Sequence, residues 1–490
     1  MALMIRRVTN DILRIFEDGF LSPDEEKIRL GSMTSTDSMP KDSSMPLNEE
    51  TAINPKGKFW IEAYGCSSSM NDSEIISGIL RNKGYLISKT PYDSSVNIIV
   101  TCSVKDATEH RMLHRVKKLT ELGSPLIVAG CLPKADRRKV EALNPSASLM
   151  GPDTIEKVTE VVCSAISGQR QVELEVNDSS PKLNIPKIRL NPVVSIVQIA
   201  SGCLSECSFC QTKLVKGNLK SYRPGDIVRQ IKADINQGCK EIWLSSTDNG
   251  CYGRDIGSNL ASLLQQCCEL DGEFKIRIGM MNPMYIPQLL SPLLDILLHE
   301  SKVLKFLHIP VQSGSDRILR KMRRGHSALT FMKGVQFFRE RIPKITIATD
   351  IIVGYPSETE EDFQQTVDLL KKTRPDIVNI SKYSARPGVL ASSEKKVPSH
   401  ITKKRTHTLD KLAKEISLVR NSQWVGWTGN IIIDEVKDNF IQGRNFAYKP
   451  VVLDPTHYKK ASIYALSLGS EIKVRVFKFT KHALWGANLL

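Results

Sequence analysis

The feature that most constrains the fold is an alternation of short apolar runs with stretches of helical periodicity. From about 193 to 398 the chain contains six apolar runs, at 194–199, 241–244, 275–278, 305–309, 345–353 and 376–380. Amphipathic stretches such as 224–236 and 360–372 separate them. Strands that alternate with helices form parallel sheets, and six such units predict a partial barrel. Functional groups are then expected at the carboxyl ends of the strands.

Three cysteines follow the first of these runs directly. Cys203, Cys207 and Cys210 are spaced by four and then three positions. Three thiolates this close suit a cubane iron–sulfur cluster with one iron free of protein ligands, whereas a structural zinc site would need a fourth Cys or His nearby. The alternative is a group of reactive or merely buried thiols. The spacing favours the cluster, and the free iron is a place for a substrate or cofactor to bind.

A second alternation, from about 59 to 166, predicts an open parallel α/β sheet. Its apolar runs cover 59–64, 96–100 and 126–129, and Cys66, Cys102 and Cys131 follow them. Because the carboxyl ends of parallel strands gather at one edge, the three thiols can converge. The pattern indicates a second cluster site, with unconnected core thiols as the alternative. The cysteines without comparable placement, which we expect to be structural, are Cys163, Cys239, Cys251, Cys267 and Cys268.

Composition bears on the partners and on the compartment. Lys plus Arg total 68 against 53 for Asp plus Glu, giving a net charge of +15 and a pI of about 9.2. This balance favours a polyanionic partner, nucleic acid before a membrane surface, although a generally basic proteome is an alternative. Neither a secretory signal nor a membrane-spanning apolar run is apparent, which predicts a cytoplasmic protein without a membrane partner. Eleven cysteines in a reducing compartment indicate metal or redox chemistry rather than disulfides.

The two ends of the chain differ in character. Residues 22–57 lack periodicity and predict a disordered extension, preceded by a possible short helix at 5–20. From about 423 to 490, short strands such as 429–433 and 472–476 predict a small β-barrel of a kind that binds RNA. Basic and aromatic residues there suit phosphates and unstacked bases, but half of the aromatics could instead be barrel core. They are Lys437, Arg444, Lys449, Lys459, Lys460, Lys473, Arg475, Lys478, Lys481, Phe440, Phe446, Tyr448 and Tyr458.

The cysteine triplet, with an aromatic residue before its last member, resembles the radical S-adenosylmethionine (SAM) signature. The resemblance implies that Cys203, Cys207 and Cys210 hold a [4Fe-4S] cluster and that Phe209 lies against the adenine of SAM. It also implies that the free iron chelates the methionine part of SAM. The cofactor then carries the difficult chemistry, while the protein orients the reactants and excludes water.

Nearly the whole chain after Lys56 resembles the methylthiotransferase family, and the tail is similar to that family's TRAM domain. The barrel motifs resemble the archaeal and eukaryotic branch that makes 2-methylthio-N6-threonylcarbamoyladenosine in tRNA; they lie at 238–242, 246–255, 277–283, 308–315 and 383–388. The implied domains are a variable extension (1–57), an α/β domain with an auxiliary cluster (58–170), a partial TIM-type radical SAM core (190–420) and an RNA-binding TRAM barrel (423–490).

The function implied is methylthiolation of C2 of N6-threonylcarbamoyladenosine at position 37, in the anticodon loop. The resemblance implies two [4Fe-4S] clusters, SAM and an electron donor protein, with Cys66, Cys102 and Cys131 holding the auxiliary cluster. The alternatives are methylthiolation of N6-isopentenyladenosine in tRNA, of an aspartate in a ribosomal protein, or a non-catalytic iron–sulfur regulator that binds RNA. The basic tail disfavours a cationic ribosomal protein as docking partner.

Several strand ends are candidates for SAM contacts. Thr247 and Asp248 end the second barrel strand, where an anionic Asp suits the ammonium group of SAM. Asn282, Gln312 and Ser313 are expected to bind its ribose or carboxylate, with ordinary structural hydrogen bonding as the alternative. The chain departs from the family pattern where Asn, Phe and Gly are usual; it has Ser69, Tyr355 and Ser357 there. No predicted cluster ligand is changed.

Overall fold

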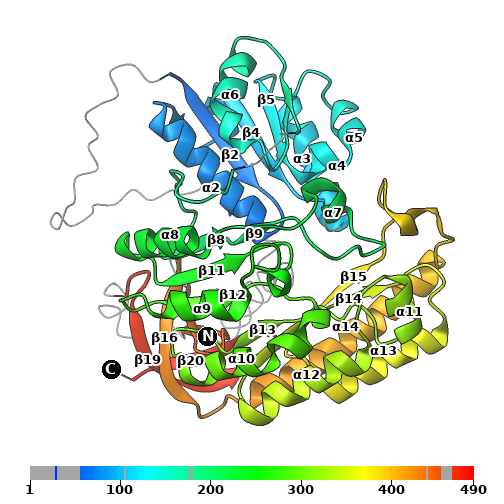
Figure 1. The fold of residues 1–490 in the computed structure, drawn as a ribbon. Coiled ribbons are helices and arrows are strands. Elements are labelled where there is room, and N and C mark those ends of the chain that lie inside the picture. The colour runs from blue at the N-terminus through cyan, green and yellow to red at the C-terminus, as the bar shows by residue number, and fades with distance from the viewer. Residues whose placement is uncertain are drawn as a thin grey trace, which may run out of the picture. The chain divides into compact units, whose positions relative to one another are not determined.

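The computed structural model describes residues 28–29, 56–103, 106–175, 180–437, 440–453 and 466–489. The described residues form two compact units, one of those up to Leu190 and the other of those from Asn191 onward. Figure 1 shows the elements of each. The predicted helix at 5–20 and almost all of the predicted extension lie outside the described residues. Among the described helices, none combines the length and apolarity that crossing a membrane requires.

The first unit contains the predicted parallel sheet, in the order β1-β2-β4-β5-β6-β7, with β3 paired to β2. Every pair is parallel except β1 with β2. The strands are β1 (Ile28–Arg29), β2 (Lys58–Ala63), β3 (Leu86–Ile87), β4 (Val96–Thr101), β5 (Leu126–Gly130), β6 (Ser148–Met150) and β7 (Val172–Glu173).

Helices cover both faces of this sheet. On one face, α2 (Ser67–Asn82) and α6 (Val158–Ile166) pack on alternate strand residues such as Ile61 and Ile98. On the other, α3 (Asp106–Thr120) and α5 (Arg137–Glu141) pack on residues such as Ile99 and Val128. Successive strand residues point to opposite faces, so both sets are buried. The continuous apolar runs of the sequence follow from this two-sided burial.

The second unit begins with the partial barrel. Two three-stranded parallel sheets, β8-β11-β12 and β13-β14-β15, are joined by a bridge between Ile276 and Val303. The strands are β8 (Val194–Gln198), β11 (Glu241–Ser245), β12 (Lys275–Ile278), β13 (Phe306–His308), β14 (Thr346–Val353) and β15 (Ile377–Lys382). The helices between them are α8 (Pro224–Asn236), α9 (Leu260–Cys268), α10 (Ile286–His299), α12 (Ala328–Arg341) and α13 (Glu360–Thr373). The predicted α/β fold class is confirmed.

A closed five-stranded barrel ends the chain, with the order β16-β17-β18-β20-β19. Its strands are β16 (Thr428–Lys437), β17 (Phe440–Asn445), β18 (Pro450–Leu453), β19 (Glu471–Phe479) and β20 (Leu484–Asn488). Two of the predicted RNA-binding aromatics pack inward: Phe446 is partly buried against the barrel core, and Tyr448 is buried against Phe306. The Phe440 side chain, Tyr458, Lys459 and Lys460 lie outside the described residues.

Helix α14 (Ser399–Ser422) connects the mouth of the partial barrel to the closed barrel. Near its start, Thr402 lies so close to Gly354, just beyond β14, that a Cβ on this glycine would meet the Thr402 Oγ1 at 2.5 Å. Near its end, the Ser417 hydroxyl donates to the Lys481 carbonyl at 2.6 Å. In Figure 1 the helix runs beside α13. It therefore links the two regions that the sequence predicts to bind substrate.

Buried charges hold the two barrels together. Asp376, at the start of β15, contacts Lys449 of the closed barrel at 3.0 Å, Arg420 of α14 at 3.1 Å and Arg339 of α12 at 3.0 Å. Burial alone would raise the pKa of Asp376, but these three cations lower it to about 2. The carboxylate is therefore ionised and shared between three elements.

We expect Asp376→Asn to lower the free energy of unfolding of this unit by about 3–5 kcal/mol, because it leaves three buried cations without their anion. The free energy of unfolding is measured by denaturant titration, followed by Trp fluorescence. Asp410→Asn, which breaks a half-exposed pair with Lys414 on α14, is the matched control and should cost less than about 1 kcal/mol. The folded pKa of Asp376 lies below its unfolded value near 3.8. Its contribution is therefore present above pH 4 and is lost as the pH falls toward 2.

Candidate active site

A tight backbone turn presents Cys203. Gly202 has a φ of 67° and lies so close to the turn after α7 (Gln211–Lys216) that a Cβ would meet the Asn218 carbonyl oxygen at 1.9 Å. Only glycine permits both the conformation and the approach. The Cys203 amide then donates to the Gly217 carbonyl at 3.3 Å. The first cysteine of the triplet is thereby held at the carboxyl end of the first barrel strand.

Ser208 anchors the rest of the cysteine loop. Its amide donates to the Met322 carbonyl at 3.1 Å, and its hydroxyl donates to the Lys321 carbonyl at 2.8 Å. The Tyr355 hydroxyl lies 2.8 Å from the Ser208 Oγ. The departure from Phe to Tyr at 355 therefore adds a polar contact to this loop. The second departure, Ser357, adopts a φ of 65°, a conformation that favours the more usual glycine.

The thiols of the triplet lie in different electrostatic environments. Cys203 is buried, its sulfur accepts the Ser205 amide at 3.3 Å, and a hydrogen bond from Cys251 lowers the pKa of Cys203 to about 7. The Cys207 sulfur accepts from Arg324 Nη1 at 3.3 Å. Burial raises the pKa of Cys207, and the charge of Arg324 opposes that rise. Such pairing stabilises the thiolate form, which is the form that binds metal.

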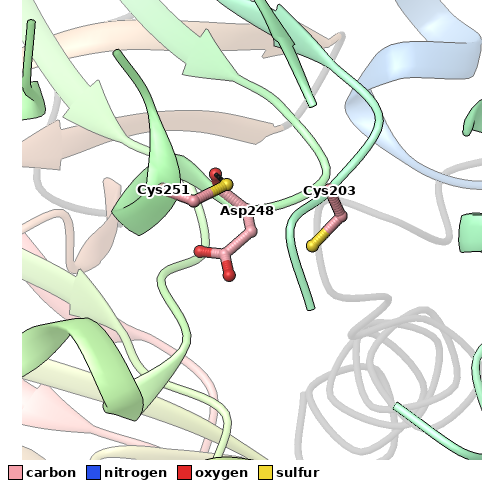
Figure 2. Close-up of side chains that lie close together, drawn as sticks. All are labelled: Cys203, Asp248 and Cys251. Carbon is pink, nitrogen blue, oxygen red and sulfur yellow. Dashed lines mark hydrogen bonds between the residues drawn. The ribbon is translucent and has the colours of Figure 1, made fainter. Parts of the chain in front are cut away.

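Asp248 organises the end of β11. One of its carboxylate oxygens accepts the amides of Gly250 and Asn282, each at 3.0 Å, and burial raises the pKa of this carboxyl group. Figure 2 shows Asp248 between Cys203 and Cys251, whose sulfurs lie within 4.8 Å of each other and of its carboxylate. The carboxylate and the first cysteine of the triplet therefore face the same small volume.

Several buried side-chain oxygens at the same strand ends have no hydrogen-bond partner among the described residues. They belong to Gln198 at the end of β8, Ser246 and Thr247 after β11, and Gln312 after β13. Gln312 also has a φ of 72°, which is uncommon outside glycine and is found at functional sites. Each buried group without a hydrogen bond lowers the stability of the fold by about 1–3 kcal/mol. A polar ligand that donates to these oxygens would remove this cost. Their arrangement fits a cofactor such as SAM, with its ammonium and hydroxyl donors.

The remaining predicted contacts are arranged differently. The Asn282 amide group donates to the Ser205 hydroxyl at 3.3 Å, within the cysteine loop. The Ser313 hydroxyl instead lies 3.4 Å from Thr366 of α13 and accepts the Ser315 amide, so it already has structural partners. Phe209 packs against a hydrophobic cluster that includes Tyr355. These roles in cofactor binding stay predictions.

The second cysteine triad lies at one edge of the first unit's sheet. Cys66 caps the amino end of α2, Cys102 follows β4, and Cys131 begins α4 (Cys131–Ala135). Thr101 and Gly130 lie opposite each other at the ends of β4 and β5. Cys102 and Cys131, which follow them, therefore lie at the same edge of the sheet. A Cβ on Gly65 would meet the Cys102 sulfur at 2.8 Å. The turn before Cys66 therefore packs directly against Cys102.

Both triads have the donor chemistry that an iron–sulfur cluster requires. Cys203, Cys207 and Cys210 lie on one loop after the first barrel strand, whereas Cys66, Cys102 and Cys131 follow three strands of the first sheet. The sulfur of Cys66 lies 3.8 Å from the hydroxyl of Ser69, one of the departures from the family pattern. Soft thiolate ligands select such clusters. The residues present therefore fit the two clusters that the sequence predicts.

The sequence does not reveal every residue at the barrel mouth. Cys251 was expected to be an ordinary structural thiol, and it lies against Cys203 and Asp248. Arg324 was not singled out because no local pattern connects it to Cys207. The same holds for Asp350, which contacts His308 at 3.0 Å and Asn379 at 2.8 Å across three neighbouring strands. Only the strand register brings these side chains together.

Exposed basic residues form two further groups. On β19 the side chains of Lys473, Arg475 and Lys478 are exposed, together with Phe477. On α14, the basic face consists of exposed residues over the first four turns: His400, Lys403, Lys404, His407, Lys411 and Lys414. The three basic residues of β19 are among those predicted from the sequence, whereas Phe477 and the basic face of α14 are not. Two other predicted RNA-binding residues form ion pairs within the protein instead: Arg444 pairs with Asp434, and Lys449 pairs with Asp376.

Two family models match parts of this chain, and a solved structure is similar to it. Residues 197–370 match the model of the Radical SAM superfamily, and residues 58–151 match that of the Uncharacterized protein family UPF0004. The solved structure of the radical SAM methyltransferase TsrM of Kitasatospora setae is similar with a TM-score of 0.47 and 12% identity, covering 66% of this chain and 72% of that one.

Two relatives are similar over most of their length. The probable threonylcarbamoyladenosine tRNA methylthiotransferase of Pyrococcus horikoshii is 39% identical over 81% of this chain and 93% of its own. The human threonylcarbamoyladenosine tRNA methylthiotransferase is 34% identical over 92% of this chain and 76% of its own.

The barrel with its cysteine triplet defines a radical SAM enzyme, of the class that uses SAM and a [4Fe-4S] cluster. The matches over both units make the assignment specific. The chain belongs to the threonylcarbamoyladenosine tRNA methylthiotransferase family, whose members carry two iron–sulfur clusters and act on tRNA.

We expect Gly65→Ala to abolish most binding of iron at the first unit, because the added Cβ would lie 2.1 Å from the Cβ of Cys102 and displace that thiol. Iron analysis and the optical spectrum after anaerobic reconstitution measure this loss. Gly84→Ala is a matched control in the same unit, since Gly84 also has a positive φ but nothing lies within 4 Å of the added carbon. Equal iron content in both variants would contradict the placement of Cys102 at the site.

Proposed function

We propose that this chain methylthiolates C2 of N6-threonylcarbamoyladenosine at position 37 of tRNA, in the cytoplasm. The observation that carries the proposal is the presence of two cysteine triads, each at the carboxyl ends of parallel strands, in a chain similar along most of its length to enzymes named for this activity. One triad alone would be compatible with any radical SAM reaction. The second triad and the basic barrel favour, among these reactions, the insertion of sulfur into RNA.

The residues divide the work as follows. Cys203, Cys207 and Cys210 would hold the radical SAM cluster, and Cys66, Cys102 and Cys131 the auxiliary one. When bound, the clusters and SAM supply the radical and sulfur chemistry that an unactivated aromatic C–H bond requires. We assign these roles within domains at 58–170 and 190–420, with the TRAM barrel at 423–490.

The chain's own side chains orient the cofactor. The carboxyl group of Asp248 is placed to pair with an ammonium group, and its second oxygen is not used by the amides of Gly250 and Asn282. The buried oxygens of Thr247 and Gln312 would accept hydrogen bonds from the same ligand, which removes the cost of leaving them unsatisfied. Asn282, Ser313 and Phe209 complete the proposed contacts. An electron donor protein is the remaining partner that the reaction requires.

RNA would bind along α14 and β19. The basic face of α14 leads from the carboxyl end of β14 toward the closed barrel, so it connects the site of chemistry to the exposed Lys473 and Arg475. Its charges suit phosphates, which position an RNA without reading its sequence. Phe477 of β19, 39% exposed among these cations, offers a face on which an unpaired base can stack.

We expect Lys403→Glu/Lys404→Glu to weaken tRNA binding by about tenfold or more, and to reduce the slope of log Kd against log salt by roughly one for each phosphate that is no longer neutralised. Filter binding over a range of salt concentrations measures both. The matched control is Lys232→Glu/Lys333→Glu, the same change of charge on exposed residues of α8 and α12. If the control weakens binding as much, net charge rather than α14 is responsible.

The proposed reaction is tested by mass spectrometry of tRNA nucleosides from cells with and without this gene. We expect loss of 2-methylthio-N6-threonylcarbamoyladenosine and accumulation of its unmethylthiolated precursor. Loss of the isopentenyl analogue instead would refute the choice of substrate. Reconstituted protein that forms no 5′-deoxyadenosine from SAM under anaerobic, reducing conditions would refute the enzymatic role altogether.

A further inference from the structure

Cys251 is a buried thiol that the proposed reaction does not use. It ends the short turn after β11, with 0% exposure, and its sulfur lies 3.1 Å from the Asp248 carbonyl oxygen. The Cys203 sulfur is its other polar neighbour. Its sulfur, the Cys203 sulfur and a carboxylate oxygen of Asp248 all lie within 4.8 Å of one another (Figure 2).

An ordinary core thiol has different neighbours. Cys267, also at 0% exposure, lies on the apolar face of α9, with Leu263 and Leu264 buried beside it in the same helix. Cys251 faces a carboxylate and another thiol instead. Bringing these groups together out of water is costly unless something compensates, because both thiols and the carboxyl group lose solvation. A bound cation is the direct compensation for such a set.

We propose that, in the chain without its clusters, Cys203, Cys251 and Asp248 bind a single divalent transition-metal ion of the zinc type. Two thiolates and one carboxylate are ligands that Zn²⁺ prefers, and a water molecule completes a tetrahedral set. Binding replaces the two thiol protons, which leave to solvent. The ligands carry three negative charges against two on the ion, and the remaining charge is opposed by Arg324 and Arg254, which act on Asp248.

The arrangement of the triplet supports this site. Among the described residues, the set that comes within 4.8 Å is Cys203 with Asp248 and Cys251, not Cys203 with the other cysteines of its loop. Cys207 is turned to Arg324 at 3.3 Å. Because Cys203 is shared, the ion and the proposed radical SAM cluster exclude each other. That competition rests on the proposed role of Cys203, whereas binding of the ion does not.

The ion site is tested on the full-length chain with its other candidate ligands removed. Cys66, Cys102, Cys131, Cys207 and Cys210 are replaced by Ala, and the protein is titrated anaerobically with Co²⁺. We expect one Co²⁺ per chain with a thiolate-to-metal charge-transfer band. Adding Cys251→Ala should weaken binding by at least about tenfold, while adding Cys267→Ala, an equally buried cysteine, should not. No binding, or equal binding after Cys251→Ala, would overturn the proposal.

A second measurement tests the ion site if the chain with five cysteines replaced by Ala does not fold. Wild-type, Cys251→Ala and Cys267→Ala chains are reconstituted with iron and sulfide in the presence and absence of Zn²⁺, and their iron content and optical spectra are compared. We expect Zn²⁺ to lower the iron content of the wild type and of Cys267→Ala, but much less that of Cys251→Ala. Equal inhibition of all three would mean that zinc acts at one of the cysteine triads without Cys251, and would overturn the proposal. Failure of Cys251→Ala to assemble clusters without Zn²⁺ would also count against the proposal.

These outcomes are separate from those that test the proposed function. Loss of the Co²⁺ site would leave the nucleoside analysis and the cleavage of SAM unaffected. Conversely, a chain that forms no 5′-deoxyadenosine could still bind Co²⁺ through Cys203, Cys251 and Asp248. The two proposals can therefore fail independently.

Discussion

The structure depends on close packing of backbone at the carboxyl ends of parallel strands. At Gly65 and Gly202 the chain turns with positive φ, and a neighbouring residue occupies the space where a Cβ would be. In each case the next residue is a cysteine of a predicted cluster. In the first unit, parallel register then brings Cys102 and Cys131 to the same edge as Cys66, although the three are far apart in sequence. In the second unit, Cys207 and Cys210 follow Cys203 in the same loop.

Charge is used in two ways in the second unit. Buried charges, centred on Asp376, join the partial barrel, α14 and the closed barrel, and so fix the direction in which α14 leaves the barrel mouth. Exposed charges on α14 and β19 remain available to a polyanion. The net charge of +15 does not distinguish these uses, and only burial separates Lys449 from Lys403.

The fold was largely predictable because its signals are local. Apolar runs and helical periodicity predict the strands, and α8 spans the predicted 224–236. The triads follow from the position of Cys residues after those strands. What the sequence could not provide is long-range register: the contact of Arg324 with Cys207, the hydrogen bonds of Asp350, and the approach of Cys251 to Cys203 all join separate segments. The inward positions of Phe446 and Tyr448 depend likewise on how the barrel closes and packs.

The central claim is that two separate triads of thiols each hold one cluster. Iron analysis with Mössbauer spectroscopy of the anaerobically reconstituted protein tests it most directly. We expect about eight iron atoms per chain, all in [4Fe-4S] clusters. Replacing either triad by Ala, Cys66 with Cys102 and Cys131 or Cys203 with Cys207 and Cys210, should leave about four. A wild-type chain that saturates at about four iron atoms, or loss of all iron from one triple variant, would contradict it.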